Sequence, residues 1–321
     1  MTTSLKLQML IKVANFYLRF TPSFTKLGFI ARGLPLRPVR QDLQGQNWLV
    51  TGATGGIGRA ITLLAATNGA RVFAVGRNEV ALATLVQESE QLCGSVVPIK
   101  CALDSITAIS ELVHGWAEDG KTTIDVLVNN VGILNRTFSR TSEGFETTYA
   151  TNLLGHFVLT EGLFQNNQIA SGAAIINVVS GGLYNAPLNY DRINMAPENF
   201  NGFIAYASHK RGQLALADHW RDKFAAKSIK TYAVHPGWAD TAGVKTSLPL
   251  FRKILAPILR NANEAADTIH WLAAVRPEEA RDKVWFDRKA RNAHAYPHTK
   301  IPLATPAQLA DYLFQDFTRI S

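Results

Sequence analysis

The sequence predicts an α/β fold with a doubly wound parallel sheet, built as a single domain. Short apolar runs typical of buried strands alternate with helical patterns along the chain. One such run, Trp48–Val50, leads directly into a glycine-rich turn and then into a helical pattern over Ile61–Asn68. The chain has 321 residues, of which 47% are hydrophobic, so it can bury a large core.

The first expected element is a basic amphipathic helix in an extension over residues 1–41, ahead of a catalytic domain over residues 42–321. Its polar stripe follows helical steps of four, three and four, at Gln8, Lys12, Asn15 and Arg19. Such a helix suits a membrane surface through residues 4–20, but it falls short of the ~20 apolar residues of a bilayer span. Packing of the helix on the domain is an equally open alternative.

Charge is concentrated in this extension, because seven of the 33 basic residues precede Asp42, the first acidic residue. The remainder carries 26 basic against 25 acidic side chains, which argues against nucleic acid as a partner. Cys93 and Cys101 lack a CxxC spacing, which favours a reducing compartment and a cytoplasmic location, either free or peripheral on a membrane. An organelle presequence is an alternative interpretation of the extension, because the extension is basic and contains no acidic residue. No metal site is expected, since His294 and His298 lack a third ligand.

The glycine-rich turn Thr51–Ala60 predicts a phosphate-binding site. Glycines let the backbone turn tightly and approach a pyrophosphate, whose charge then lies on the N–H groups of the following helix. The spacing is a glycine, three residues, a glycine, one residue and a glycine, and the expected contacts are Gly52, Thr54, Gly56, Ile57 and Gly58.

The choice of dinucleotide is predicted from charge after the second strand, Arg71–Val75. An NAD enzyme needs an acidic side chain there for the ribose hydroxyls, but this chain has Arg77. Arg59, just after the glycine turn, supplies a second guanidinium, and two such groups suit a 2′-phosphate. We therefore expect NADP(H) in preference to NAD(H).

Tyr206 and Lys210 form a Tyr-x-x-x-Lys pair that a helix would place side by side. A cation one turn away favours the phenolate and lowers the pKa of a tyrosine, which makes it a usable general acid or base. Ser180 and Asn152 precede this pair, and the turn Asn129–Gly132 follows the apolar strand Val126–Val128.

Together these motifs resemble the short-chain dehydrogenase/reductase family over roughly residues 45–245. The resemblance implies a Rossmann fold and a catalytic set of Asn152, Ser180, Tyr206 and Lys210. It implies further cofactor contacts at Asn130, Gly132, Tyr206, Lys210, Pro236, Gly237 and Thr241. A closer resemblance, to the subgroup called dehydrogenase/reductase member twelve, rests on residues 235–244, 266–273 and 287–289.

Two residues depart from the family pattern. Val131 replaces the usual alanine of the Asn-Asn-Ala-Gly turn. Asp104 follows Leu103 where the family has Asp-Leu, so we give Asp104 no role at the adenine.

The resemblance implies hydride transfer between the cofactor and a carbonyl carbon, with Tyr206 giving its proton to the oxygen. Lys210 would lower the tyrosine pKa and bind the nicotinamide ribose, while Ser180 would contact the substrate oxygen and Asn152 would fix a proton-relaying water. The resemblance also leaves a homo-oligomer open. The alternative is a catalytically idle NADPH sensor on the same fold.

A substrate lid is expected over residues 241–263, ahead of a C-terminal extension over residues 280–321. Its apolar stripe lies beside Arg252, Lys253 and Arg260 and consists of Leu248, Phe251, Ile254, Leu255 and Ile258. This stripe favours a lipophilic substrate, such as an acyl-chain aldehyde, a retinoid or a steroid, over a small polar ketone.

Overall fold

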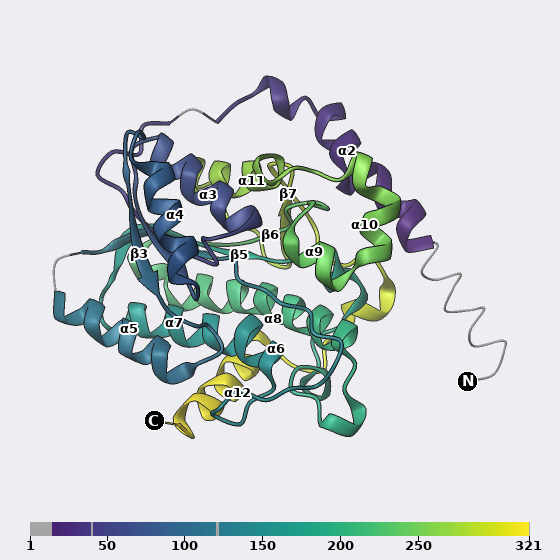
Figure 1. Cartoon of the computed structure of the whole chain (residues 1–321). Helices are drawn as coiled ribbons and strands as arrows, with labels where there is room; N and C mark the ends of the chain where they lie inside the picture. The colour runs from purple at the N-terminus through teal and green to yellow at the C-terminus, as the bar shows by residue number, and fades with distance from the viewer. Residues whose placement is uncertain (1–14, 40, 120–121, 321) are drawn as a thin grey trace, which may run out of the picture.

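A computed structural model describes residues 15–39, 41–119 and 122–320, and its centre is one eight-stranded sheet (Figure 1). The strand order is β3-β2-β1-β4-β5-β6-β7-β8, and every neighbouring pair is parallel except β7 with β8. The strands are β1 Asn47–Thr51, β2 Arg71–Gly76, β3 Ser95–Lys100, β4 Ile124–Asn129, β5 Ile169–Val178, β6 Lys230–Val234, β7 Lys283–Phe286 and β8 Lys289–Asn292.

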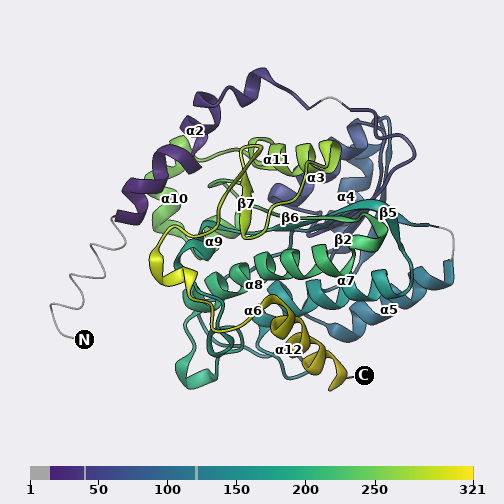
Figure 2. The same cartoon turned by 180° about the vertical axis from the view of Figure 1, so that it is seen from behind.

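Helices cover both faces of the sheet, as expected for a doubly wound fold (Figures 1 and 2). On one face lie α3 Gly56–Thr67, α4 Glu79–Ser89 and α11 Ala262–Val275. On the other lie α5 Ile106–Asp119, α7 Gly155–Gln165, α8 Gly202–Lys223 and, outside them, α12 Pro306–Thr318. Successive strand residues point to opposite faces, so Leu49 joins the α5–α7–α8 core whereas Trp48 and Val50 join the α3–α4–α11 core.

Short helical elements make up the remaining described segments near the site. They include α2 Lys26–Ala31, a 3₁₀ turn Leu34–Leu36, α6 Thr147–Tyr149, a π-helical turn Ala150–Leu154, a 3₁₀ turn Gly181–Asn185, α9 Ala242–Ser247, α10 Pro249–Leu255 and a 3₁₀ turn Ala256–Ile258. Within the described ranges, no helix is long and apolar enough to cross a membrane. The predicted C-terminal extension supplies β7 and β8, so it completes the sheet.

The described part of the N-terminal extension packs on the domain. Residues 15–24 form a helix whose Phe20 and Phe24 stack with Tyr184 at centroid distances of 5.6 and 6.0 Å. Arg19 of the predicted polar stripe donates a hydrogen bond to the Ala295 oxygen at 3.0 Å. Gln8 and Lys12, the first two positions of that stripe, lie outside the described residues. The packed alternative therefore holds for residues 15–24.

The predicted lid is two short helices instead of one continuous stripe, because Pro249 begins α10 immediately after α9. Phe251 faces the domain, with its ring centroid 5.1 Å from that of Trp238, whereas Ile254 is 67% exposed. Arg260 does not lie beside the stripe at the surface, which corrects the sequence-based expectation. It is 1% exposed, because it is buried in an ion pair with Asp287.

Candidate active site

The glycine turn joins β1 to α3 at the point where the strand order reverses between β1 and β4. Gly52 has a φ of 67° and Gly56 a φ of 51°, both in the left-handed region that favours glycine. A Cβ on Gly58 would lie 2.1 Å from the Gly52 oxygen, so only a glycine lets the helix approach the turn this closely. Because a helix leaves its first N–H groups without intrahelical partners, the N-terminus of α3 suits an anion.

Asn130, just after β4, fixes this turn from the neighbouring strand. Its Nδ2 donates to the Thr51 oxygen at 2.9 Å, and its backbone N–H donates to Thr51 Oγ1 at 2.9 Å. Two residues later, a Cβ on Gly132 would lie 3.1 Å from Lys210 Nζ. The carboxyl ends of β1 and β4 therefore bring the glycine turn and Lys210 to one place.

A single cavity of about 1030 Å³ contains most of the predicted site. Its lining includes the predicted residues Gly52, Thr54, Gly56, Ile57, Arg77, Asn130, Gly132, Ser180, Tyr206, Lys210, Pro236, Gly237 and Thr241. The volume lies at the upper end of the roughly 300–1,000 Å³ typical of ligand pockets, which leaves room for more than one small molecule. Gly58 and Asn152 are not among the lining residues, and Asn152 is fully buried.

The two arginines that we expected to act together have different surroundings. Arg77 is exposed and lines the cavity, where Asn78 begins α4 by accepting a hydrogen bond from the Ala81 N–H at 3.0 Å. Arg59 instead forms an ion pair with Glu88 of α4 and is not among the lining residues. Asp104, to which we assigned no role at the adenine, also lines the cavity, beyond the end of β3.

The Tyr206–Lys210 pair lies on α8, which begins at an Asn201 cap. The Lys210 Nζ is 5.7 Å from the Tyr206 ring centroid and donates hydrogen bonds to the Val178 oxygen and to Gln213 Oε1, at 2.8 and 2.9 Å. Burial raises the pKa of Tyr206, and a hydrogen bond with the Ser180 side chain opposes this shift. Burial also lowers the pKa of Lys210 to about 7.

The expected lowering of the Tyr206 pKa by Lys210 is therefore wrong in this structure. The ammonium group is directed at Val178 and Gln213, and burial dominates at the phenol. The phenol is protonated at neutral pH, but the raised pKa makes it a weaker acid than the Tyr-x-x-x-Lys spacing predicted.

Gln213, which the sequence analysis did not single out, connects Lys210 to Asn152. Its Nε2 donates to the Asn152 backbone oxygen at 2.9 Å and also lies 2.8 Å from His156 Nδ1. The Asn152 side chain itself pairs with both backbone groups of Ile133, each at 2.8 Å. The position of Gln213, three residues after Lys210 on the same helix, is the signal that was available in the sequence.

Part of the cavity lining is a cluster of aromatic rings, and it includes residues of the N-terminal extension. Phe16 and Tyr17 line it together with Trp238 and Phe251. The Tyr17 ring centroid lies 5.7 Å from that of Trp238 and 5.8 Å from that of Phe251. We predicted these two residues as part of the N-terminal amphipathic helix and did not connect them to the site.

These residues fit a dinucleotide, because a glycine turn that suits a pyrophosphate shares one cavity with the Tyr206–Lys210 pair. Gly55 and Gly56 line the cavity at the N-terminus of α3, and neither carries a Cβ that would block the approach of an anion.

Comparison with known proteins identifies the family. Residues 46–249 match the family model described as short chain dehydrogenase. The chain belongs to the short-chain dehydrogenase/reductase family. It is thus an oxidoreductase that acts on alcohol or carbonyl groups.

Relatives within this family extend the match beyond the catalytic core. A bovine (Bos taurus) Dehydrogenase/reductase SDR family member 12 is 31% identical over 294 residues, covering 89% of this chain and 91% of the relative. Human (Homo sapiens) Retinol dehydrogenase 12 is 28% identical, covering 89% of this chain and 92% of the relative.

A solved structure, the angucycline C-6 ketoreductase LanV with bound NADP, is 25% identical with a TM-score of 0.59, covering 74% of this chain and 91% of that one. The family's cofactor is a nicotinamide dinucleotide, in keeping with this bound NADP.

Proposed function

We propose that this enzyme interconverts a lipophilic carbonyl compound and its alcohol with NADP(H), using Tyr206 as the general acid and base. The observation that carries the proposal is the cavity in which Ser180, Tyr206 and Lys210 share one lining with the glycine turn and Arg77. Phosphate-binding and proton-transfer groups thus meet along one continuous space.

The proposed chemistry assigns a task to each buried group. The bound dinucleotide supplies or accepts the hydride. Tyr206, which is protonated at neutral pH, donates its proton to the carbonyl oxygen during reduction and takes one back during oxidation. Ser180 hydrogen-bonds the same oxygen. Lys210, held by Val178 and Gln213, lies close enough to Gly132 to contact the nicotinamide ribose.

The preference for NADP(H) is supported by Arg77 alone rather than by a pair of arginines. Arg77 is exposed at the cavity after β2, where an acidic residue would serve NAD. Arg59 already has Glu88 as its partner, so its contribution would require that pair to open.

The lipophilic substrate is supported by the aromatic part of the cavity lining. Phe16, Tyr17, Trp238 and Phe251 offer apolar rings, which favour a substrate with a large hydrophobic surface. The names of two relatives, a retinol dehydrogenase and an angucycline ketoreductase, also refer to bulky substrates.

Contact with a membrane surface is proposed for the side of the molecule that carries α2 and α10, which lie side by side in both views (Figures 1 and 2). These helices carry exposed apolar side chains, Leu27 and Ile30 on α2 and Leu250 and Ile254 on α10, between 52% and 69% exposed. Exposed basic residues, such as Lys26 and Lys253, accompany them. Apolar and basic side chains together suit an anionic lipid surface.

The proposed activity is tested by NADPH oxidation with purified protein against carbonyl compounds graded in chain length and polarity. We expect turnover to rise with the apolar size of the carbonyl compound. Faster turnover of small polar ketones would contradict the lipophilic class. Tight NADPH binding without turnover of any compound would instead favour the idle sensor.

A further inference from the structure

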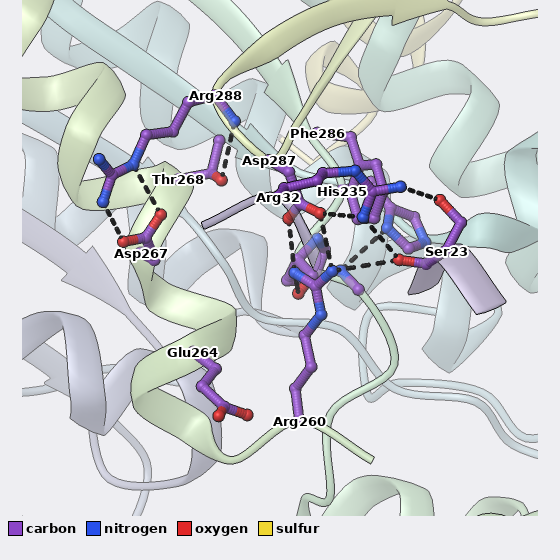
Figure 3. Close-up of polar contacts among 12 residues, drawn as sticks. Ser23, Arg32, His235, Arg260, Glu264, Asp267, Thr268, Phe286, Asp287 and Arg288 are labelled. Carbon is purple, nitrogen blue, oxygen red and sulfur yellow. Dashed lines mark hydrogen bonds and ion pairs between the residues drawn. The ribbon is translucent and has the colours of Figure 1, made fainter. Parts of the chain in front are cut away.

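A buried ion cluster joins the N-terminal extension to the Pro236–Gly237 loop (Figure 3). Arg260 Nη1 and Nη2 donate to the two oxygens of Asp287 at 2.7 and 2.9 Å. Both side chains are almost fully buried, at 2% and 1% exposure. This bidentate contact fixes the guanidinium group in both position and orientation.

The Arg260 side chain packs directly against Gly237. A Cβ on Gly237 would lie 2.4 Å from Arg260 Nε, and Gly237 has a φ of 82°. The backbone of Arg260 follows the same loop, because its N–H donates to the Trp238 oxygen at 2.8 Å and its oxygen accepts from the Asp240 N–H at 2.9 Å. A shift of Arg260 would therefore move this loop.

The N-terminal extension holds the other side of the cluster. Arg32 Nη1 donates to Asp287 Oδ2 at 2.6 Å and to the Ser23 oxygen at 3.1 Å, while its Nη2 donates to Ser23 Oγ at 2.5 Å. Arg260 also reaches this segment, with Nη2 3.3 Å from the Ser23 oxygen. Asp287 thus has one guanidinium group from the extension and one from the segment before α11.

Phe24 of the extension covers the residue that precedes the loop. Its ring centroid lies 4.3 Å from that of His235, and its backbone oxygen accepts from the Trp238 N–H at 2.8 Å. His235 Nδ1 accepts from the Gly237 N–H at 2.9 Å, so this nitrogen carries no proton. A Cβ on Gly181, next to Ser180, would lie 3.2 Å from His235 Nε2. The extension therefore reaches both the loop and the neighbourhood of Ser180.

We propose that Arg32, Asp287 and Arg260 are positioning residues, which set the Pro236–Gly237 loop for the nicotinamide end of the cofactor. The inference rests on the proposed function, in which this loop holds that end. The buried charges of Arg260 and Asp287 are a poor source of stability, because apolar residues of similar volume often serve as well. Their arrangement fixes geometry, and catalytic groups need their partners placed within a fraction of an ångström.

The test compares binding of the whole dinucleotide with binding of its adenosine half. Titration calorimetry would measure the affinity of wild type and of Arg32→Gln for NADP⁺ and for 2′,5′-ADP, which lacks the nicotinamide end. We expect NADP⁺ affinity to fall about tenfold and 2′,5′-ADP affinity to change less than about twofold, because only the nicotinamide end contacts the loop. Arg32 is partly exposed, with 27% of its side chain accessible, so the variant should fold.

Asp267→Asn provides a matched control. It breaks the ion pair between Asp267 and Arg288, whose side chains are 14% and 13% exposed and whose arginine directly follows Asp287 (Figure 3). The hydrogen bonds of Arg288 go to Thr268, Asp267 and Arg37, and none joins this pair to the Pro236–Gly237 loop within the described ranges, so both ligands should bind the control nearly as they bind wild type. Arg32→Lys keeps a positive charge beside Asp287 but loses the planar guanidinium group that also bonds Ser23. This variant should recover part of the NADP⁺ affinity.

Unchanged NADP⁺ affinity in Arg32→Gln, or an equal loss for both ligands, would overturn the proposal. If Arg32→Gln does not fold, Arg32→Lys, which keeps a charge for Asp287, gives the same comparison, and a selective loss of NADP⁺ affinity is again expected. Tighter binding of NAD⁺ than of NADP⁺ by wild type would contradict the proposed cofactor alone. The positioning test would then compare NAD⁺ with AMP.

Discussion

At the scale of single residues, the site depends on groups that burial has shifted away from their ordinary behaviour. Burial raises the pKa of Tyr206 further above neutrality, whereas burial lowers the pKa of Lys210 to about 7, so that Lys210 titrates near neutrality. The ammonium form of Lys210 is held by two oxygen acceptors, from Val178 and Gln213. Small changes to these acceptors should therefore change the protonation of Lys210.

Gln213 offers a test of this view. Gln213→Ala removes one acceptor and should lower the pKa of Lys210 further, whereas Gln213→Glu places a carboxylate beside the ammonium group and should raise it. The limb of the pH–kcat profile that reports Lys210 should move to lower pH in the first variant and to higher pH in the second. Shifts in the same direction, or none, would argue against the role of Gln213.

Arg77 carries the predicted preference between cofactors. Arg77→Ala removes the guanidinium group expected to contact the 2′-phosphate, so NADPH affinity should fall about 10- to 100-fold while NADH affinity changes little, in line with about 1.5–3 kcal/mol for a hydrogen bond to a charged group. Fluorescence titration with both cofactors measures this. Arg59→Ala is the matched comparison, and we expect a smaller effect because Arg59 is paired with Glu88. A wild type that binds both cofactors equally would contradict the assignment.

At the scale of elements, α8 and the N-terminal extension do the most to build the site. α8 presents Tyr206, Lys210 and Gln213 at helical spacing, so one rigid element holds all three. The extension contributes Phe16 and Tyr17 to the cavity and Arg32 to the buried ion cluster. Deletion of residues 1–40 would thus damage the site, and membrane binding is better tested with single surface changes.

Ile254→Glu is such a change, because it adds a negative charge to the exposed face of α10. Pelleting with anionic phosphatidylserine vesicles should fall several-fold, since charge repulsion adds to the loss of apolar contact. Val80→Glu is the control, because Val80 is 76% exposed on α4, away from this side. Equal pelleting of wild type and both variants would contradict the proposed membrane contact.

At the scale of the whole molecule, stability should depend on pH because several histidines are buried in the neutral form. Burial lowers the pKa of His156 and His235 to about 3 and that of His209 and His270 to about 4. Between these values and about 6.5, the unfolded chain binds more protons than the folded one, so the free energy of unfolding rises with pH in this window.

The predicted outcome is a loss of stability on acidification below about pH 6.5. Each of these histidines adds up to about 1.4 kcal/mol per pH unit to the slope of the free energy of unfolding. Urea unfolding at pH 7 and pH 5 measures the slope. Replacement of His270 by Gln should reduce this slope by up to about 1.4 kcal/mol per pH unit, the contribution of one histidine. An unchanged slope would contradict the assignment of His270 as buried in the neutral form.

Much of this architecture was predictable because it depends on local sequence. The strand, glycine turn and helix around Gly52–Gly58 and the Tyr206–Lys210 spacing are short-range patterns that the fold preserves. The Arg59–Glu88 pair, the burial of Arg260 and the approach of Tyr17 to Phe251 depend on contacts between distant segments. No periodicity in the sequence records such contacts, and tertiary packing decides them.

Tyr206→Phe tests the central claim most directly, since it removes only the phenolic oxygen. The measurement is kcat for NADPH oxidation with the best carbonyl substrate, beside the NADPH dissociation constant by fluorescence titration. We predict that kcat falls by about 10²- to 10⁴-fold, the usual contribution of a general acid, while NADPH binding stays within about twofold. A variant that retains most of its turnover would contradict the account.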